Sequence, residues 1–322
     1  INYIYFKTVV TWCCWFQRYD SVAEWWLSEY EVSHIEKDFE SLWNQIKPLY
    51  QHIHAYVRRH LRLKYGEDVV SAKGPIPAHL LGGRSATYLS SDVAWSKKYF
   101  HVSGFHEAVG DVIALSVATP KHLRVMGLLE DGPDDLESNI NQLYKMVRTL
   151  INLYTYNIKT GSRSDGSRTT TPDDYNCHFW QLRESLQGIE PPAPRSEQDF
   201  DPAAKYHISA DVETSRSAVT LATFQFHRSL CQLAGEYVEG DPNKLLSNCD
   251  IYKSTTAGIA LGKMLQLGSS KPWPEAMEAI TGQSDMDAGG LLDYFAPLYD
   301  WLREENERTG EFVGWEPSTV RK

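Results

Sequence analysis

Apolar side chains recur at three- and four-residue steps along residues 32–65, as at Ile46, Leu49 and Ile53. This spacing places them on one face of an α-helix and predicts a helix over the whole stretch. Gly66 ends the pattern, as expected of a glycine that lies just beyond a helix C-terminus. The first well-patterned part of the chain is therefore expected to be one long helix.

Further helices are predicted along the rest of the chain, whereas the strict alternation typical of strands is scarce. The stretch 108–117 is almost wholly apolar and is expected to form a buried helix that ends before Pro120. The predicted helices are 108–117, 136–156, 211–235, 251–267, 273–282 and 289–308. Polar or Pro-rich runs at 159–175 and 188–204 indicate connecting loops. These patterns together predict a mainly α fold.

The N-terminal residues 1–16 are apolar and aromatic but include Lys7. They lack the basic start and the small-residue cleavage site that define a signal peptide, so no clear signal peptide is predicted. Two interpretations stay open for this segment. It forms a buried strand or helix, or it is the remainder of a targeting or anchor segment.

Composition narrows the class of protein. The 322 residues carry a net charge of −10 with a sequence pI near 5.6, which argues against a nucleic-acid-binding surface. The mean hydropathy is −0.42, and no uncharged apolar run reaches the length of a membrane span, which excludes a polytopic membrane protein. We expect one large globular unit with no nucleic-acid partner.

The densest group of candidate catalytic or metal-ligating residues is His101, His106, Glu107 and Asp111. The zinc motif H-E-x-x-H requires two histidines four positions apart on one helix face. Here Gly110 stands four positions after His106, and no H-E-x-x-H string occurs anywhere in the sequence. The carboxylates of Glu107 and Asp111 share one helix face by their spacing. They either stabilise the start of a helix or serve a metal or acid–base site.

A second group surrounds Lys205 and His207, which can hold an anionic or carbonyl group of a ligand or can be exposed loop residues. Phe224 and Phe226 are expected in the core. Cys231 and Cys249 are separated by an acidic loop and are able to form a disulfide in an oxidising compartment.

Several strings together resemble the angiotensin-converting enzyme family of zinc peptidyl-dipeptidases, with details closer to invertebrate members. They occur in the family's order and include GPIPAHLLG, GFHEAVGDVIALSV, AAKYHI, FQFHRSLC, NCDIYKSTTAG and KPWPEAM. The resemblance covers residues 25–316, leaving 1–24 unmatched and 317–322 as a tail. It implies a helical, clam-like fold with a central cleft. It also implies a secreted or cell-surface hydrolase that releases C-terminal dipeptides from peptides, in the manner of a carboxypeptidase.

The resemblance assigns roles to individual residues. Glu107 matches the third zinc ligand, and Asp111 matches the carboxylate that orients a zinc-binding histidine. Lys205 matches the ligand of the substrate's C-terminal carboxylate, and His207 matches a histidine that steadies a substrate carbonyl. The family's chloride-binding arginines correspond to Arg183 and Arg216.

The departures from the family pattern concern catalysis. Near residues 83–103 the chain passes from GPIPAHLLGG to GFHEAVGD without the family's segment that contains H-E-x-x-H. Ser217 and Thr214 stand where the family has tyrosines that stabilise the oxyanion and the carboxylate. We therefore expect an inactive, truncated member that does not bind zinc.

Two alternatives stay open. The chain is an incomplete gene model or splice product of an active zinc peptidyl-dipeptidase, or His79, His101, His106 and Glu107 form a different metal site.

Overall fold

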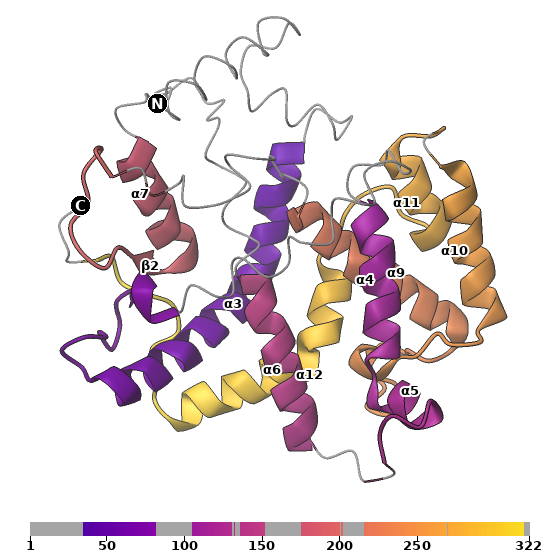
Figure 1. Cartoon of the computed structure of the whole chain (residues 1–322), viewed down its shortest axis with the longest axis horizontal. Coiled ribbons are helices and arrows are strands. Elements are labelled where there is room, and N and C mark those ends of the chain that lie inside the picture. The colour runs from indigo at the N-terminus through magenta and orange to yellow at the C-terminus, as the bar shows by residue number, and fades with distance from the viewer. Residues whose placement is uncertain are drawn as a thin grey trace, which may run out of the picture.

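The computed structural model describes residues 35–81, 105–130, 132, 136–151, 175–199, 201, 216–268 and 270–318. Within these ranges the protein is mainly α, as predicted (Figure 1). The predictions for residues 1–16 and for Lys205 and His207 lie outside the described residues. So do nearly all of the predicted loop 159–175 and of the stretch 83–103 at which the family's segment is missing.

The described helices and strands follow the order of the chain. The α-helices are α3 (Ile35–Tyr65), α4 (Phe105–Val117), α5 (Pro120–Val125), α6 (Leu136–Ile151), α7 (Tyr175–Gln187), α9 (Arg216–Ala234), α10 (Thr255–Leu267), α11 (Trp273–Thr281) and α12 (Gly289–Arg308). Two short 3₁₀ helices, η2 (Ala78–Leu81) and η6 (Leu246–Asn248), and two short strands, β1 (Ile76–Pro77) and β2 (Ile189–Glu190), complete them.

Each stretch predicted as a helix contains one, with ends that differ by up to four residues where the structure describes them. Helix α7 is the main helix that the periodicity did not predict. Its first backbone N–H groups, at Asn176 and Cys177, donate to the carboxylate of Glu197 at 2.9 and 2.7 Å. This carboxylate acts as an N-terminal cap from about twenty residues further along the chain, so no local capping pattern marks the start of the helix.

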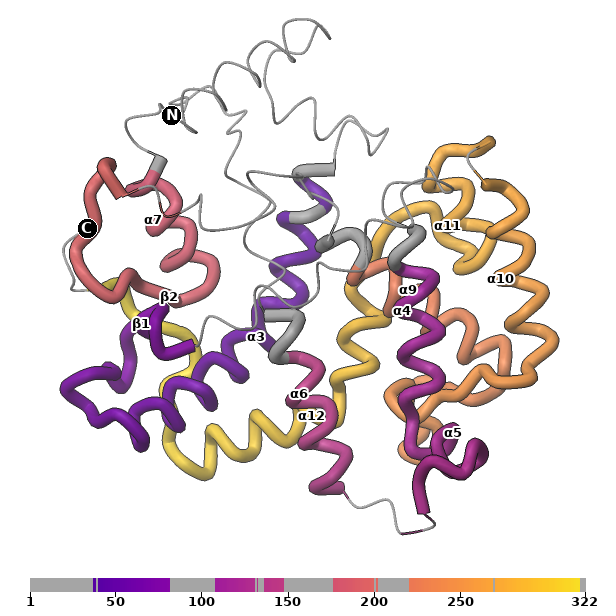
Figure 2. Tube along the Cα trace, in the orientation of Figure 1, coloured from indigo at the N-terminus to yellow at the C-terminus, as the bar shows by residue number. Residues whose placement is uncertain are grey.

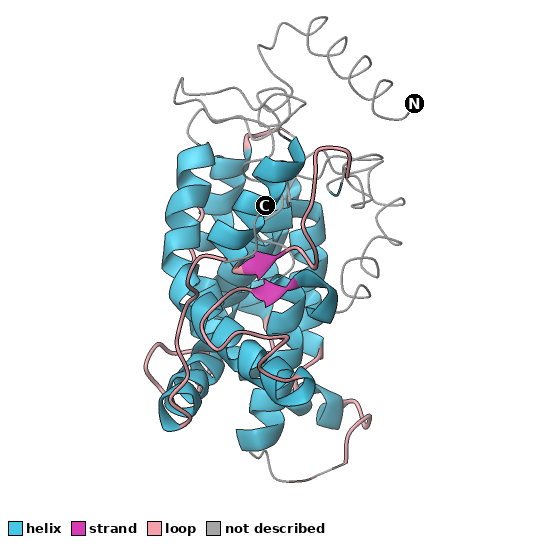
Figure 3. Ribbon diagram, turned by 90° about the vertical axis from the view of Figure 1, so that its left-hand side faces the viewer, coloured by secondary structure: helices cyan, strands magenta, loops and turns pink. Residues whose placement is uncertain are grey.

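The strands β1 and β2 pair in parallel, with Ile76 opposite Ile189 and Pro77 opposite Glu190 (Figure 3). The Ile76 N–H also donates to the Gly188 carbonyl at 2.8 Å. A two-residue strand cannot show the alternation by which strands are recognised, which explains why the sequence did not predict this pair.

The two longest helices, α3 and α12, pack against each other and change direction along their length (Figure 1). Each carries an internal proline, Pro48 in α3 and Pro297 in α12. Proline lacks the N–H needed for the helical hydrogen bond and crowds the preceding turn, which is the usual cause of such a bend.

Three apolar clusters form the core of the described residues, and the two larger ones share α9, whose backbone Figure 2 traces. Phe224 lies in the first cluster, with side chains of α3, α6 and α12. Phe226 lies in the second cluster, with side chains of α4, α10 and α11. Both phenylalanines are buried, as predicted. Helix α9 therefore joins the two halves of the described structure.

The C-terminal segment is held against α3 by one buried cation, Arg58. Its guanidinium donates to the carbonyls of Gly314 at 2.7 Å and Gly74 at 3.2 Å, and also to that of Phe312. Burial lowers the pKa of Arg58 to about 10, so the side chain stays charged at neutral pH. Beside it, Trp315 packs on the rings of Tyr50 and His54.

Gly188, directly before β2, lies against Trp315 of this C-terminal segment. Its φ of 61° lies in the left-handed region, and a Cβ there would come within 2.7 Å of His54 Nε2 and closer still to Trp315. Only glycine meets both conditions without strain. The Nε2–H of His54 donates to the Gly188 carbonyl at 2.9 Å, while its Nδ1 is buried with no hydrogen-bond partner among the described residues.

We predict that Gly188→Ala lowers the free energy of unfolding by about 3 kcal/mol, because the methyl group adds a clash to the backbone strain. Gly235→Ala is the matched control. Its φ is 73°, yet no atom lies within 4 Å of an added Cβ, so only strain of about 1 kcal/mol is expected. Urea titration measures both values. If the two variants lost the same free energy of unfolding, the added methyl group at position 188 would not clash with Trp315 and His54, and the prediction would be wrong.

A second prediction concerns acid pH. Burial lowers the pKa of His54 from its ordinary value of 6.5 to about 3, so the unfolded chain takes up this proton first on acidification. Stability is therefore complete above pH 6.5 and falls by about 1.4 kcal/mol per unit below it. Between pH 7 and 5, wild type should lose about 2 kcal/mol more than His54→Gln, whose amide can still donate to Gly188. Parallel pH profiles for the two proteins would contradict this.

Candidate functional site

Helix α4 carries the strongest candidate residues, Glu107 and Asp111. Glu107 lies in the first turn, and its side chain is outside the described residues. Asp111 lies one turn later and is exposed. The two positions follow one another on the same side of the helix, as their spacing predicted. The roles implied by the resemblance, zinc ligand and orienting carboxylate, stay predictions.

The prediction that 108–117 forms a buried helix is wrong for one of its faces. Ala108 and Val112 are fully buried against α9 and its neighbours, and Leu115 is also buried. On the opposite side Ile113 is 41% exposed and Val117 is 39% exposed. The apolar sequence runs around the whole helix, but the described elements cover only one side of it.

The other predicted ligand-binding residues are only partly described. Arg183 lies on α7, with its guanidinium 5.9 Å from the centre of the Phe179 ring. Arg216 is the first residue of α9, but its side chain is outside the described residues, as are Ser217 and Thr214. The chloride site therefore stays a prediction. So does the alternative metal site, of which only the His79 side chain, in η2, is described.

Cys231 of α9 and Cys249 form the predicted disulfide. The imidazole of His227, one turn before Cys231, lies 3.5 Å from its sulfur, and all three side chains are buried. In the described part of the chain this is the one group of three potential metal ligands within 4.8 Å of one another. Because the sulfurs are bonded to each other, neither is a thiolate ligand. The group is a covalent crosslink, and burial lowers the pKa of His227 to about 4.

A buried polar group not recognised in the sequence joins α4, α5 and the segment after the disulfide. The Ser116 hydroxyl donates to Asp250 Oδ1 at 2.9 Å, and His122 Nδ1 lies 2.9 Å from Oδ2. Ser116 also accepts from the Ile251 N–H at 2.9 Å. These three residues are of the types found in a catalytic triad, but their arrangement differs from one. The serine hydroxyl donates to the carboxylate, whereas in a triad it donates to the histidine.

The electrostatics of this group match a structural role. Burial acts to raise the pKa of Asp250. The Tyr252 N–H and the side chains of His122 and Ser116 outweigh this effect and hold the pKa below its usual value. The carboxylate therefore stays ionised and connects the three segments.

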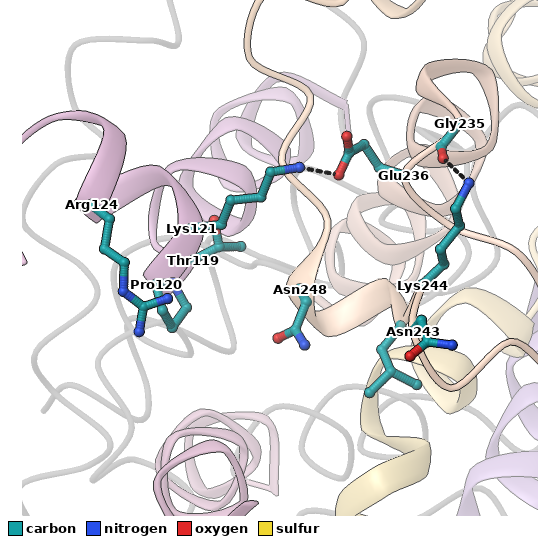
Figure 4. Close-up of a pocket in the computed structure, with 10 residues that line it drawn as sticks. Thr119, Pro120, Lys121, Arg124, Gly235, Glu236, Asn243, Lys244 and Asn248 are labelled. Carbon is teal, nitrogen blue, oxygen red and sulfur yellow. Dashed lines mark hydrogen bonds and ion pairs between the residues drawn. The ribbon is translucent and has the colours of Figure 1, made fainter. Parts of the chain in front are cut away.

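One cavity of about 630 Å³ lies between the start of α5 and the segments that follow α9 (Figure 4). Lys121 pairs with Glu236 across it, and Lys244 donates to the Gly235 carbonyl at 2.9 Å. No residue predicted from the sequence as a site residue lines it. Its lining residues are Thr119, Pro120, Lys121, Arg124, Gly235, Glu236, Asn243, Lys244, Leu245 and Asn248.

None of the described helices combines the length and the apolar character that crossing a bilayer requires.

Comparison with known proteins gives a consistent result. The family profile described as angiotensin-converting enzyme, peptidase M2, matches residues 11–102 and 94–315. The angiotensin-converting enzyme-related protein of Drosophila melanogaster is 33% identical, with 92% of this chain and 65% of the relative covered. The angiotensin-converting enzyme of Bos taurus is 34% identical over 92% of this chain but only 31% of its own length. The angiotensin-converting enzyme of Haematobia irritans exigua is 34% identical, and the match covers 87% of this chain and 64% of that relative.

The lengths of these matches differ from the length of the chain. The match with the Drosophila relative spans 410 positions, whereas 92% of this 322-residue chain is about 296 residues. About 114 positions of the relative therefore face gaps in this chain. The two ranges matched by the family profile meet at residues 94–102, directly before α4. The chain spans less than two thirds of these relatives. By the extent of the profile match, it belongs to the angiotensin-converting enzyme family, peptidase M2.

Proposed function

We propose that the 322-residue chain is a member of this family that binds peptides without hydrolysing them. The observation that carries the proposal is the missing catalytic motif. The single His-Glu pair of the sequence, His106-Glu107, is followed by Gly110 where the motif requires its second histidine. Without that motif the chain lacks two zinc ligands and the glutamate that activates water.

The residues present do not fit a catalytic zinc ion. Such a site takes three protein ligands and a water molecule, and the resemblance supplies Glu107 alone. Asp111 would orient a zinc-bound histidine, but the chain has no such histidine in the family's position. The His227, Cys231 and Cys249 group does not replace it, because both sulfurs form the disulfide.

The residues that bind the peptide in the family have counterparts here. Lys205 is assigned to the substrate's C-terminal carboxylate and His207 to a backbone carbonyl. Arg183 and Arg216 are assigned to chloride. Peptide binding is therefore proposed to survive the loss of hydrolysis. Ser217 in place of the oxyanion tyrosine also supports the loss of hydrolysis, because one lost transition-state donor lowers the rate by about 10²–10³.

The proposed location is outside the cell. The family resemblance implies a secreted or cell-surface protein. The Cys231–Cys249 disulfide supports this location, because disulfides persist in oxidising compartments.

A second candidate is an incomplete gene model or splice product of an active zinc peptidyl-dipeptidase. The retained string GFHEAVGD favours it, because Glu107 and Asp111 have roles only beside the missing histidines. The roughly 114 unmatched positions of the Drosophila relative also support it. Sequencing of transcripts across residues 83–103 distinguishes the two. An in-frame segment with H-E-x-x-H would establish the second candidate.

We predict that the purified chain retains no stoichiometric zinc after dialysis and does not cleave a blocked tripeptide. Elemental mass spectrometry and chromatography of the products measure the two results. The Haematobia irritans exigua relative, treated in parallel, serves as the comparison. Stoichiometric zinc together with cleavage that a chelator and Glu107→Ala both abolish would overturn the proposal.

The same experiment includes a binding measurement. The tripeptide with a free carboxylate should bind about tenfold more tightly than its C-terminal amide, because the ammonium of Lys205 pairs with the carboxylate. Lys205→Ala should remove this difference while the affinity for the amide stays the same. Equal affinities of the wild-type chain for both peptides would contradict the assigned role of Lys205.

A further inference from the structure

The cavity between α5 and the segments after α9, which we call the α5 cavity, has a charge opposite to that of the whole chain. Its described lining includes three cationic side chains, Lys121, Arg124 and Lys244, and one carboxylate, Glu236. These four give a net charge of +2, whereas the chain carries −10. We propose that the α5 cavity binds a phosphate or sulfate ester of a hydroxyl-bearing molecule of about the size of a sugar. The proposal depends neither on zinc nor on peptide binding.

The two walls of the α5 cavity are fixed to each other. One wall is the start of α5, and the other consists of residues from 235–248, which lie within the loop closed by the Cys231–Cys249 disulfide. His122 Nδ1 of α5 lies 2.9 Å from Oδ2 of Asp250, the residue that follows this disulfide. The crosslink and the buried pair thus hold the walls in place before a ligand arrives. Such pre-organisation lowers the entropic cost of binding.

Arg124 and Lys244 are the side chains that we assign to the oxyanion. They come from opposite walls, and Figure 4 shows the Asn248 side chain between them. The Lys244 ammonium donates to the Gly235 carbonyl at 2.9 Å, which is its one hydrogen bond among the described residues. Because an ammonium has three N–H groups, it retains donors for a ligand oxygen. Hydrogen bonds from guanidinium and ammonium groups to phosphate or sulfate oxygens are charge-assisted and strong.

Glu236 orients the ligand. Its carboxylate pairs with Lys121 across the cavity, and both side chains are partly exposed. Exposed ion pairs contribute little free energy, so a ligand can rearrange this pair at small cost. A carboxylate repels an anionic group but accepts a hydrogen bond from a hydroxyl group. The hydroxyl-bearing part of the ligand is therefore expected beside Glu236, and the oxyanion away from it.

The size and the lining of the α5 cavity indicate a polar organic ligand rather than a single ion. The volume of about 630 Å³ lies within the range of roughly 300–1,000 Å³ that is usual for sites of small organic molecules. Pro120 and Leu245 supply the larger apolar side chains of the described lining, which contains no aromatic ring. An apolar ligand would therefore find few contacts, whereas a sugar ester has groups for the polar side chains.

The loop closed by the disulfide carries two further carboxylates, and both have partners of their own. Glu239 pairs with Arg228 at 3.5 Å. Asp241 Oδ1 accepts from the backbone and side-chain amides of Asn243 at 2.9 and 3.2 Å. Neither carboxylate belongs to a residue of the described lining. The acidic sequence of this loop therefore does not make the cavity negative.

Titration calorimetry of the full chain in a buffer free of phosphate and sulfate tests the proposal. The probes are glucose 6-phosphate and glucose 6-sulfate, and glucose and inorganic phosphate are the controls. We expect saturable binding of at least one ester, about tenfold or more tighter than that of either control. The tighter ester shows which of the two groups the site prefers. Absence of saturable binding by both esters would overturn the proposal, and so would inorganic phosphate that binds as tightly as the esters.

Charge variants locate the site. Lys244→Gln and Arg124→Gln should each weaken binding of the ester by about tenfold, because each removes a charge-assisted hydrogen bond. Lys263→Gln is the matched control. It removes the same charge from an exposed position on α10 that is not part of the described lining, so it should bind as wild type does.

Glu236→Gln should change the affinity in the opposite direction. It removes the repelling carboxylate and keeps Lys121, so the ester should bind about threefold more tightly. A variant that fails to fold cannot give this gain, and thermal melting without ligand checks the fold of every variant. Two results would show that the esters bind elsewhere. One is equal weakening by Lys244→Gln and Lys263→Gln, and the other is an affinity that Glu236→Gln leaves unchanged.

Discussion

The burial of the middle of α9 on all sides is the constraint on which the rest of the described structure depends. Residues 221–227 are buried without interruption, so this helix has no solvent face over two turns. Phe224 belongs to one core cluster and Phe226 to the other, so each cluster depends on a side chain of α9. The α12 backbone approaches so closely that a Cβ at Gly290 would lie 2.5 Å from the Phe224 carbonyl oxygen. Only glycine allows this contact.

Polar side chains on and beside α9 fix the segments that surround it. The amide of Gln225 donates to Gln283 and to the Asp285 carbonyl, both at 3.0 Å, and accepts from the Asp287 N–H at 3.2 Å. These bonds hold the connection between α11 and α12. The disulfide between Cys231 and Cys249 covalently ties the segment after α9 to the end of this helix. The packing around α9 is therefore stabilised by hydrogen bonds and a disulfide within this chain, without the missing segment.

The positions of most helices could be predicted because their apolar periodicity is local. The start of α7 depends on Glu197, and the buried Ser116–Asp250 contact joins residues far apart in the sequence, so neither has a local signal. The error at α4 has a different cause. An apolar sequence shows that a helix favours burial, but it does not show whether the chain contains the element that covers it.

The candidate site was predicted from resemblance rather than from physical pattern. The strings around Glu107 and Lys205 indicated the family, and the profile and the relatives confirm that membership. The roles of these residues are not local properties, because a zinc ligand needs partners from another segment. The described structure tests the disulfide, which it confirms, and the burial of α4, which it corrects.

Hydrogen exchange of the full chain followed by mass spectrometry tests most directly whether α9 organises a stable body without the missing segment. Peptides covering residues 221–231 should exchange only through global unfolding, whereas α4, covered on one side, should exchange through smaller openings. If α9 exchanged as fast as α4, through openings well below the free energy of global unfolding, α9 would not be the organising element and the account would be wrong.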